Sequence, residues 1–431
     1  MKLKSFYPLL TLALVNLSLS NVGQAQTTSP KLSELSQEVA TLRKQGPAGL
    51  QIFLASHARE LASGVPAAEI RTALDALCQQ RDCYASQLYW YTDWDQAKAA
   101  AQASGKPILS LRLLGRLDQD LSCANSRFFR VALYPNAKIS RVLRDRFILH
   151  WQSVRPVPKV TIDFGDGRKL ERTITGNSIH YVLDQNGRPI DAIPGLYGPQ
   201  AFLRQLQQAE EAVKDYSREK TESNRESFLR QYHRDRLAAI QNQWATDLSK
   251  VGITALPKLT ALPQNPNQPA TAAEAGKVAY AKMIAERPIV RSLQSAATQN
   301  REALSQITDQ AAWEKLAQLH AADARLDQNS LSLMRSKKFF SRQDTHKKAE
   351  VDLLSVARQF EAAMAIDAVR NEYVLHSQIH QWFTRDFAFS NVEPLNERVY
   401  AQLFLTPSTD PWLGLSPTDT YSAIENDGIR Q

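Results

Sequence analysis

The sequence of 431 residues lacks several features that would assign it to a common functional class. After residue 25 it has no apolar run of the roughly 20 residues that a membrane-spanning helix needs, so we expect no integral membrane segment in the mature chain. No basic patch is interleaved with aromatic residues, and we therefore expect no nucleic-acid binding. A Gly-x-Ser-x-Gly elbow, a phosphate-binding loop and a dinucleotide fingerprint are absent as well.

Cysteine is scarce, with only Cys78, Cys83 and Cys123. An odd number in an exported protein leaves one thiol unpaired. On one unbroken helix the side chains of Cys78 and Cys83 would diverge too far for a disulfide. If that helix ends near Gln80, a local Cys78–Cys83 bridge becomes feasible and Cys123 stays free, and we place this pairing first. The alternative is that one of the pair approaches Cys123 and resolves a mixed disulfide formed there.

The first 25 residues have the pattern of a signal peptide. Lys2 and Lys4 precede a short apolar run, Leu9–Leu19, and small residues at Gly23 and Ala25 form a cleavage site. The alternative is an anchor that is not cleaved. We expect an exported protein, periplasmic or extracellular. The full sequence is 43% hydrophobic and 22% charged, which is ordinary for a globular protein of two or three domains.

Residues 26–87 are predicted to form an N-terminal helical segment. Apolar residues recur at helical spacing over 32–43, 48–61 and 66–80. The aromatic run 88–91 then reads as a first strand or as a packed entry segment.

The most informative stretch is 106–134. Lys106–Leu114 is a nearly continuous apolar run, which predicts a buried strand. A polar loop follows, and Cys123-Ala124-Asn125-Ser126 then opens a helix. A thiol in the first turn of a helix faces unpaired backbone N–H groups and the positive end of the helix dipole, which favour the nucleophilic thiolate. Arg127 would strengthen this effect, and Ser126 can donate a hydrogen bond to the sulfur. The alternative is a buried structural cysteine.

Further elements surround this stretch in a recognisable order. A helix is predicted over 92–105, a helical turn over 140–146 and a strand over 147–154. Two apolar runs flank Asp184-Gln185-Asn186-Gly187, a strong hairpin signal, and a closing helix begins at Pro199. With these parts, residues 88–209 resemble the thioredoxin-like proteins, which implies an α/β domain at 88–210 with a mixed sheet flanked by helices.

This resemblance also sets the expectations for the site. The redox motif of the family is Cys-x-x-Cys, whereas here Ser126 takes the second position. The family places a cis-proline opposite the active thiol, and Ser178 occupies the matching position. A lone thiol can form a mixed disulfide but lacks the built-in partner that resolves it.

Two functions follow from these residues. In the first, the chain performs thiol–disulfide chemistry on a protein substrate through Cys123 alone, by monothiol exchange or isomerisation. In the second, it is a redox-inactive thioredoxin-fold module that binds a partner or serves as a scaffold in the cell envelope. Neither function requires a cofactor.

An insertion at 156–175 has two alternating runs around Gly165-Asp166-Gly167, which predicts a second hairpin. The hairpin either extends the main sheet or stands as a flap over Cys123.

The C-terminal half is predicted to be a mostly α-helical domain at 211–385, with a proline-rich loop at 254–271 and an irregular tail at 386–431. His376 and His380 share a helix face at a spacing that suits metal ligation. The zinc-protease pattern would need Glu where Ser377 stands, and no third ligand is evident. We therefore expect two surface or interface histidines and no metal.

Overall fold

The computed structural model describes residues 30–62, 64–173, 176–253, 310–337, 353–385 and 391–412. The predicted signal peptide and the proline-rich loop at 254–271 lie outside these ranges, as does most of the predicted tail. Within them, no helix is both long enough and apolar enough to cross a membrane.

The helices and strands occur in the following order along the chain: α1 (Pro30–Arg43), α2 (Pro47–Ser56), α3 (Ala58–Leu61), α4 (Ala68–Cys78), α5 (Cys83–Ser86), α6 (Trp94–Ser104), β1 (Ile108–Leu114), α7 (Ala124–Phe128), the π-helix η1 (Phe129–Leu133), α8 (Ala137–Arg146), β2 (Ile148–Arg155), β3 (Lys159–Asp163), β4 (Lys169–Thr173), β5 (Ser178–Leu183), β6 (Pro189–Pro194), α9 (Pro199–Arg218), α10 (Glu222–Lys250), α14 (Gln310–Leu319), the 3₁₀-helix η3 (Ala321–Ala324), α15 (Gln328–Ser336), α16 (Leu353–Arg370), the π-helix η4 (Asn371–His376), α17 (Ser377–Arg385), α18 (Val392–Arg398) and the π-helix η5 (Val399–Leu403).

The centre of the molecule is a four-stranded mixed sheet in the order β2-β1-β5-β6. β1 and β2 run parallel, while β5 is antiparallel to both β1 and β6. Tyr91 adds an isolated parallel bridge to His150 of β2, so the aromatic run 88–91 touches the sheet with one residue. Every residue of β1, β5 and β6 is buried, so both faces of the sheet are covered, and apolar residues predominate in these strands.

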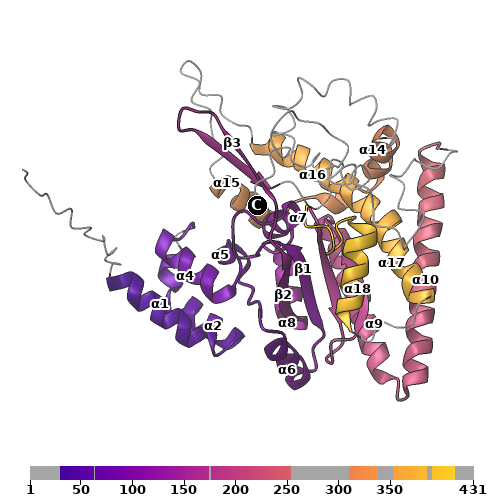
Figure 1. The fold of residues 1–431 in the computed structure, drawn as a ribbon, viewed down its shortest axis with the longest axis horizontal. Coiled ribbons are helices and arrows are strands. Elements are labelled where there is room, and N and C mark those ends of the chain that lie inside the picture. The colour runs from indigo at the N-terminus through magenta and orange to yellow at the C-terminus, as the bar shows by residue number, and fades with distance from the viewer. Residues whose placement is uncertain are drawn as a thin grey trace, which may run out of the picture.

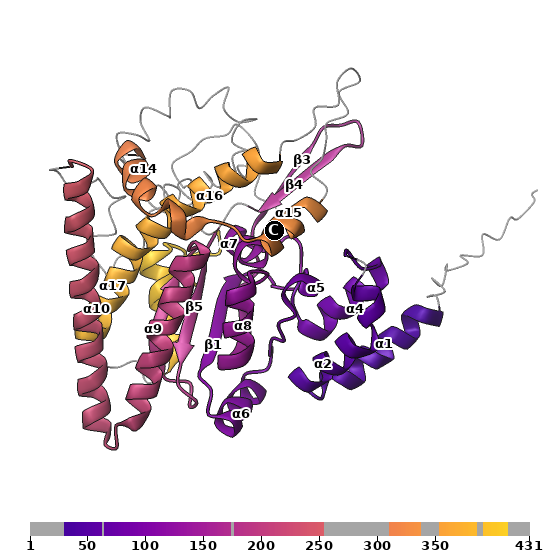
Figure 2. The same cartoon turned by 180° about the vertical axis from the view of Figure 1, so that it is seen from behind.

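Helices cover the two faces of the sheet, as the opposite views in Figures 1 and 2 show. The side chains of successive strand residues point to opposite faces, and His180 and Tyr181 of β5 mark the two. The ring of His180 packs against Phe129 of η1 and Phe202 of α9. The hydroxyl of Tyr181 donates to Asn396 of α18 on the other face. The layers are therefore helix, sheet and helix.

The C-terminal helices share the core of the sheet. One continuous hydrophobic cluster extends from Leu88 to Phe404 and joins the sheet to α9, α10, α16 and α17. In Figure 1, α10 and α17 lie side by side next to the sheet. The α/β part followed by a helical region is confirmed, but the two parts are not packed as separate cores, because the β6 edge of the sheet needs apolar cover.

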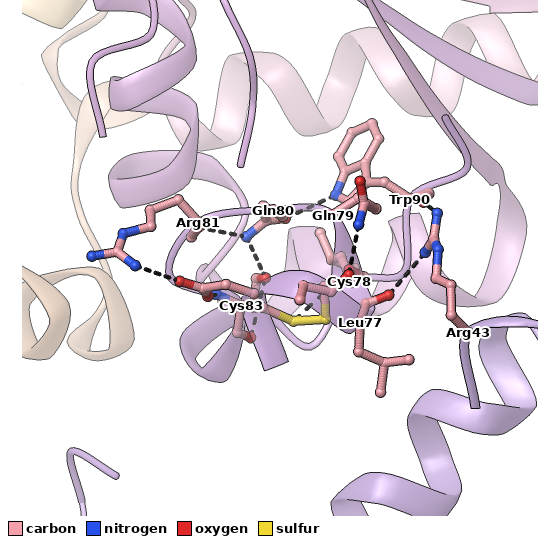
Figure 3. Close-up of a disulfide and its surroundings, with 12 residues drawn as sticks. Arg43, Leu77, Cys78, Gln79, Gln80, Arg81, Cys83 and Trp90 are labelled. Carbon is pink, nitrogen blue, oxygen red and sulfur yellow. Dashed lines mark hydrogen bonds and ion pairs between the residues drawn. A yellow bond between two sulfur atoms is a disulfide. The ribbon is translucent and has the colours of Figure 1, made fainter. Parts of the chain in front are cut away.

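The N-terminal helices have a small core of their own, with Leu50, Phe53 and Leu74 at its centre. α4 ends where Gln79 adopts the left-handed conformation (φ 55°), and the chain turns back into α5. This turn brings Cys78 and Cys83 together in a disulfide, drawn in Figure 3. Arg43 donates to the carbonyl oxygens of Leu77 and Trp90 beside it, which ties this unit to the segment entering the sheet.

Two segments differ from the sequence-based expectations or decide between them. The hairpin β3–β4 forms a separate two-stranded sheet that projects from the body, so it does not extend the main sheet (Figures 1 and 2).

The tail predicted to be irregular contains α18 and η5. Asn391 caps this helix by accepting from Glu393 N, and Val392, Leu395 and Val399 bury its apolar face. Pro394 lies in the first turn, where a proline is tolerated.

Candidate functional site

Cys123 lies beside the carboxyl end of β1. Its backbone N–H donates to the carbonyl of Leu114 at 3.1 Å, which folds the polar loop 115–122 back onto the end of the strand. Cys123 is the N-cap of α7, one position before the first helical residue, and its backbone is extended. The helix continues without interruption as the π-helix η1. The predicted layout of strand, loop, cysteine and helix is therefore present.

The thiol is fully buried and surrounded by polar atoms. The sulfur lies 2.8 Å from Ser178 Oγ, 3.4 Å from Ser126 Oγ and 3.8 Å from the carbonyl oxygen of Asn177. Ser126 donates its single hydroxyl proton either to Ser122 Oγ at 2.7 Å or to the carbonyl of Cys123 at 2.8 Å. Its oxygen is thus an acceptor toward the sulfur, and so is the carbonyl of Asn177. The arrangement suits a thiol that donates a hydrogen bond.

Two segments distant in sequence close over this thiol. From the C-terminal side, the hydroxyl of Tyr400 in η5 donates to the Asn177 carbonyl at 3.1 Å, and Thr406 accepts from Asn177 Nδ2 at 3.1 Å. From the inserted hairpin, Thr173 at the end of β4 donates to the carbonyl of Ser122 at 3.0 Å. The base of the hairpin therefore contributes to the cover, while its tip projects away.

The two arginines that follow the cysteine are held by other partners. Arg127 donates to Thr173 Oγ1 at 3.0 Å. Arg130 is buried, donates to the Asp120 carbonyl and pairs with Asp82 at 3.8 Å. Burial lowers the pKa of the Arg130 guanidinium, and the Asp82 carboxylate partly opposes that shift.

The other two cysteines are joined to each other. The Cα atoms of Cys78 and Cys83 are 6.2 Å apart, and both side chains are buried in the N-terminal core (Figure 3). This is the pairing that the sequence analysis placed first. With both sulfurs in this bond, neither is a thiol that could resolve a mixed disulfide at Cys123.

A second cluster of reactive side chains lies between β6 and the C-terminal helices. His376 and His380 are fully buried, so the prediction of surface or interface histidines is wrong. Asp191 of β6 and His233 of α10 complete the cluster: His376 Nε2 lies 3.2 Å from Asp191 Oδ1, and His380 Nδ1 lies 2.7 Å from His233 Nδ1. Glu372 approaches the other nitrogen of His376, Nδ1, at 3.1 Å.

The charges of this cluster are strongly coupled. Burial disfavours the imidazolium of His376, but Glu372 and Asp191 outweigh it and raise the pKa of His376 to about 9. Burial of Asp191 is likewise outweighed by the surrounding histidines, so its pKa lies well below the ordinary value. For His233 and His380 burial dominates and lowers the pKa of each imidazole, that of His233 to about 4.

Sequence reasoning missed Asp191 and His233 as members of this cluster. Asp191 is 185 residues from His376, and His233 is 147 residues from His380. No local spacing signals such a convergence. The only signal in the sequence was the pair His376 and His380 on one helix face.

A polar cavity of about 430 Å³ lies next to the cluster, between α9, α10 and η4. Its lining includes Gln205, Arg236, Gln243 and Tyr373. Glu372 also lines it and so separates the cavity from His376.

Comparisons with known proteins assign no family to this chain. No protein-family model matches the sequence, and the search of curated proteins gives no significant match.

Proposed function

We propose that this chain is an exported protein of thioredoxin-like fold that acts as a binding or scaffold module in the cell envelope and does not perform dithiol exchange. The observation that carries this proposal is the environment of Cys123. Its side chain has no exposed surface and is hydrogen-bonded among serine hydroxyls and a carbonyl group.

The order of the elements supports the thioredoxin-like part of the proposal. Helix α6, strand β1, the helix that begins after Cys123, strand β2, the β5–β6 hairpin and the closing helix α9 follow the order on which the resemblance rests. Export is supported by the signal-peptide pattern of residues 1–25.

The two departures from the redox motif support a module without dithiol activity. Ser126 replaces the resolving cysteine, and Ser178 replaces the proline that would face the thiol. Ser178 fills the space next to the sulfur with a hydroxyl at 2.8 Å, where a protein substrate would have to approach.

Binding is supported by the shared core and by the polar cavity. The cavity of about 430 Å³ falls within the size range of ligand sites, and its wall presents side-chain amides, a guanidinium and a phenol. Its position between the closing helix α9 of the α/β part and the helical half explains why both parts would be needed for one module.

The test is the reactivity of Cys123 in the purified mature protein. We expect iodoacetamide to alkylate native Cys123 at least about a hundredfold more slowly than the chain in urea, the factor that a local opening free energy of about 3 kcal/mol gives. Cys123→Ser should keep the folded structure and any partner that the wild type binds. Rapid native alkylation would contradict the proposal.

Thiol chemistry through Cys123 is the second candidate, and one observation favours it. Ser178 Oγ at 2.8 Å can turn its proton toward the sulfur and stabilise a thiolate. In that case mixed disulfides with an added model disulfide would form on the native protein, and they would disappear in Cys123→Ser.

A further inference from the structure

The cluster between β6 and the C-terminal helices has the composition of a metal centre. We infer that Asp191, His376 and His380 bind a divalent transition-metal ion of the zinc class. One potential ligand atom from each of the three side chains lies within 4.8 Å of the others, and all three are fully buried. This inference does not depend on the proposed function of the Cys123 region.

Hydrogen-bond partners hold the ligand side chains in place, as in established metal sites. His376 presents Nε2 toward Asp191, while its Nδ1 lies 3.1 Å from Glu372 Oε2. A metal-bound histidine almost always donates its other N–H to a carboxylate, a carbonyl or water, which fixes the ring and its tautomer. Glu372 is itself held by Gln205 at 2.8 Å and Tyr197 at 3.2 Å.

Asp191 is held in the same way. Its Oδ2 accepts a hydrogen bond of 2.6 Å from the hydroxyl of Tyr232 in α10, and its Oδ1 accepts one from the backbone of Ala192. The carboxylate therefore faces His376 in a fixed orientation. The set consists of two imidazoles and a carboxylate, which come from η4, α17 and β6.

Two of the imidazoles have no carboxylate of their own among the described residues. His380 and His233 contact each other through Nδ1 atoms 2.7 Å apart, and His380 Nε2 has no hydrogen-bond partner in that part of the chain. A metal ion would use a lone pair of His380, and the contact with His233 would hold that ring in place.

The local backbone also departs from a regular helix at this point. Glu372 and His376 both lie in the π-helix η4, between α16 and α17. A π-turn inserts an extra residue and changes the direction of the side chains that follow, and such turns are frequent at functional sites.

The ligand types select the class of ion. Imidazole nitrogen together with carboxylate oxygen suits Zn²⁺ and its transition-metal neighbours, whereas Ca²⁺ and Mg²⁺ prefer oxygen ligands alone. The neighbouring cavity is lined by Glu372 and not by the three ligands. We therefore assign the ion a structural role, in which it joins the edge strand β6 to η4 and α17.

The experiment uses the full mature chain, stripped with a chelator and dialysed against metal-free buffer. Titration with Zn²⁺ should show one ion per chain and raise the thermal midpoint, and Co²⁺ should give a ligand-field spectrum in the visible range. Asp191→Asn and His380→Gln should abolish both effects, whereas His57→Gln, in the N-terminal helices, should leave both unchanged. Equal thermal midpoints with and without Zn²⁺, or full binding by His380→Gln, would overturn the inference.

A milder variant covers the case in which the ligand variants fail to fold. Glu372→Gln keeps the shape of the side chain but removes the charge behind His376. We expect it to fold and to bind Zn²⁺ about 10- to 100-fold more weakly, the usual effect of losing such an outer partner. Unchanged affinity in this variant would show that the ion, if one binds, is not held through His376.

Discussion

The sulfur of Cys123 lies 2.8 Å from the hydroxyl oxygen of Ser178, the first residue of β5. The two residues come from opposite sides of the site, one from the loop after β1 and the other from the start of the central hairpin. In the thioredoxin-like resemblance, Ser178 takes the position of a proline that would face the thiol. Here the hydroxyl group of Ser178 occupies that position and is hydrogen-bonded to the thiol of Cys123.

The first prediction concerns this hydrogen bond. Ser178→Ala leaves the buried thiol without its nearest partner, and we expect a loss of about 1 kcal/mol in the free energy of unfolding. Alkylation of native Cys123 should become several-fold faster because the cover over the sulfur is weakened. Urea denaturation and timed alkylation measure the two effects. Ser104→Ala, at the exposed end of α6, is the control and should change neither.

The second prediction concerns the buried guanidinium of Arg112. Arg112 in β1 is 2% exposed and donates to Glu393 of α18 at 2.6 Å, one of the contacts that join the sheet to this helix. Glu393→Ala leaves the buried charge unpaired and should cost about 1–3 kcal/mol of unfolding free energy. Arg112→Met should cost less, because an apolar side chain needs no partner there.

The two substitutions form a double-mutant cycle. In the Arg112→Met background, Glu393→Ala should have almost no further effect on the urea midpoint, since the charge that it paired is gone. The same cost in both backgrounds would show that Glu393 stabilises α18 by other means.

The third prediction concerns the disulfide. Cys78 and Cys83 are five residues apart, and closing so short a loop stabilises the folded state by about 2 kcal/mol on the chain-entropy model. A reductant should lower the unfolding free energy by about this amount. Cys123→Ser should respond to the reductant like the wild type, whereas the double substitution Cys78→Ala and Cys83→Ala should not respond. A response that depends on Cys123 would instead favour pairing with that residue.

The fourth prediction concerns acid. Burial lowers the pKa of His180 from 6.5 to about 3. As pH falls below 6.5 the unfolded chain takes up a proton at this residue and the native state does not. Above pH 6.5 the neutral His180 therefore does not reduce the free energy of unfolding. As the pH falls from 6.5 toward 3, the free energy of unfolding decreases, by up to about 1.4 kcal/mol per pH unit. His150 in β2 has the same shift, with burial as its main cause.

Two variants isolate the effect of His180. His180→Phe keeps an aromatic ring between Phe129 and Phe202 and should reduce the acid slope of the unfolding free energy between pH 6.5 and 5 by about 1 kcal/mol per pH unit. Tyr134→Phe removes the hydroxyl that bonds His180 at 2.9 Å but leaves the imidazole in place, so it should keep the wild-type slope. Equal slopes in all three proteins would mean that His180 does not titrate as described.

Local patterns in the sequence were sufficient to predict most of the sheet. The apolar run at 106–114, the Asp-x-Asn-Gly turn and the alternating hairpin at 156–175 each correspond to an element in the structure, because each depends on neighbours within a few residues. The helix at 392–403 was not predicted, because the tail from residue 386 was expected to be irregular. Burial of its apolar residues stabilises this helix.

The sequence by itself determined the strand, the loop and the cysteine that begins α7, together with the absence of a second cysteine at Ser126. The tertiary structure decided what surrounds the sulfur. Ser178 contacts it directly, while Tyr400 and Thr173 bond to the carbonyl groups of Asn177 and Ser122 beside it. The tertiary structure also decided the cluster of Asp191 with His376 and His380. These side chains are nearly two hundred residues apart and meet only because the edge of the sheet is buried against the C-terminal helices. The periodicity of apolar residues along the chain does not predict such a long-range contact.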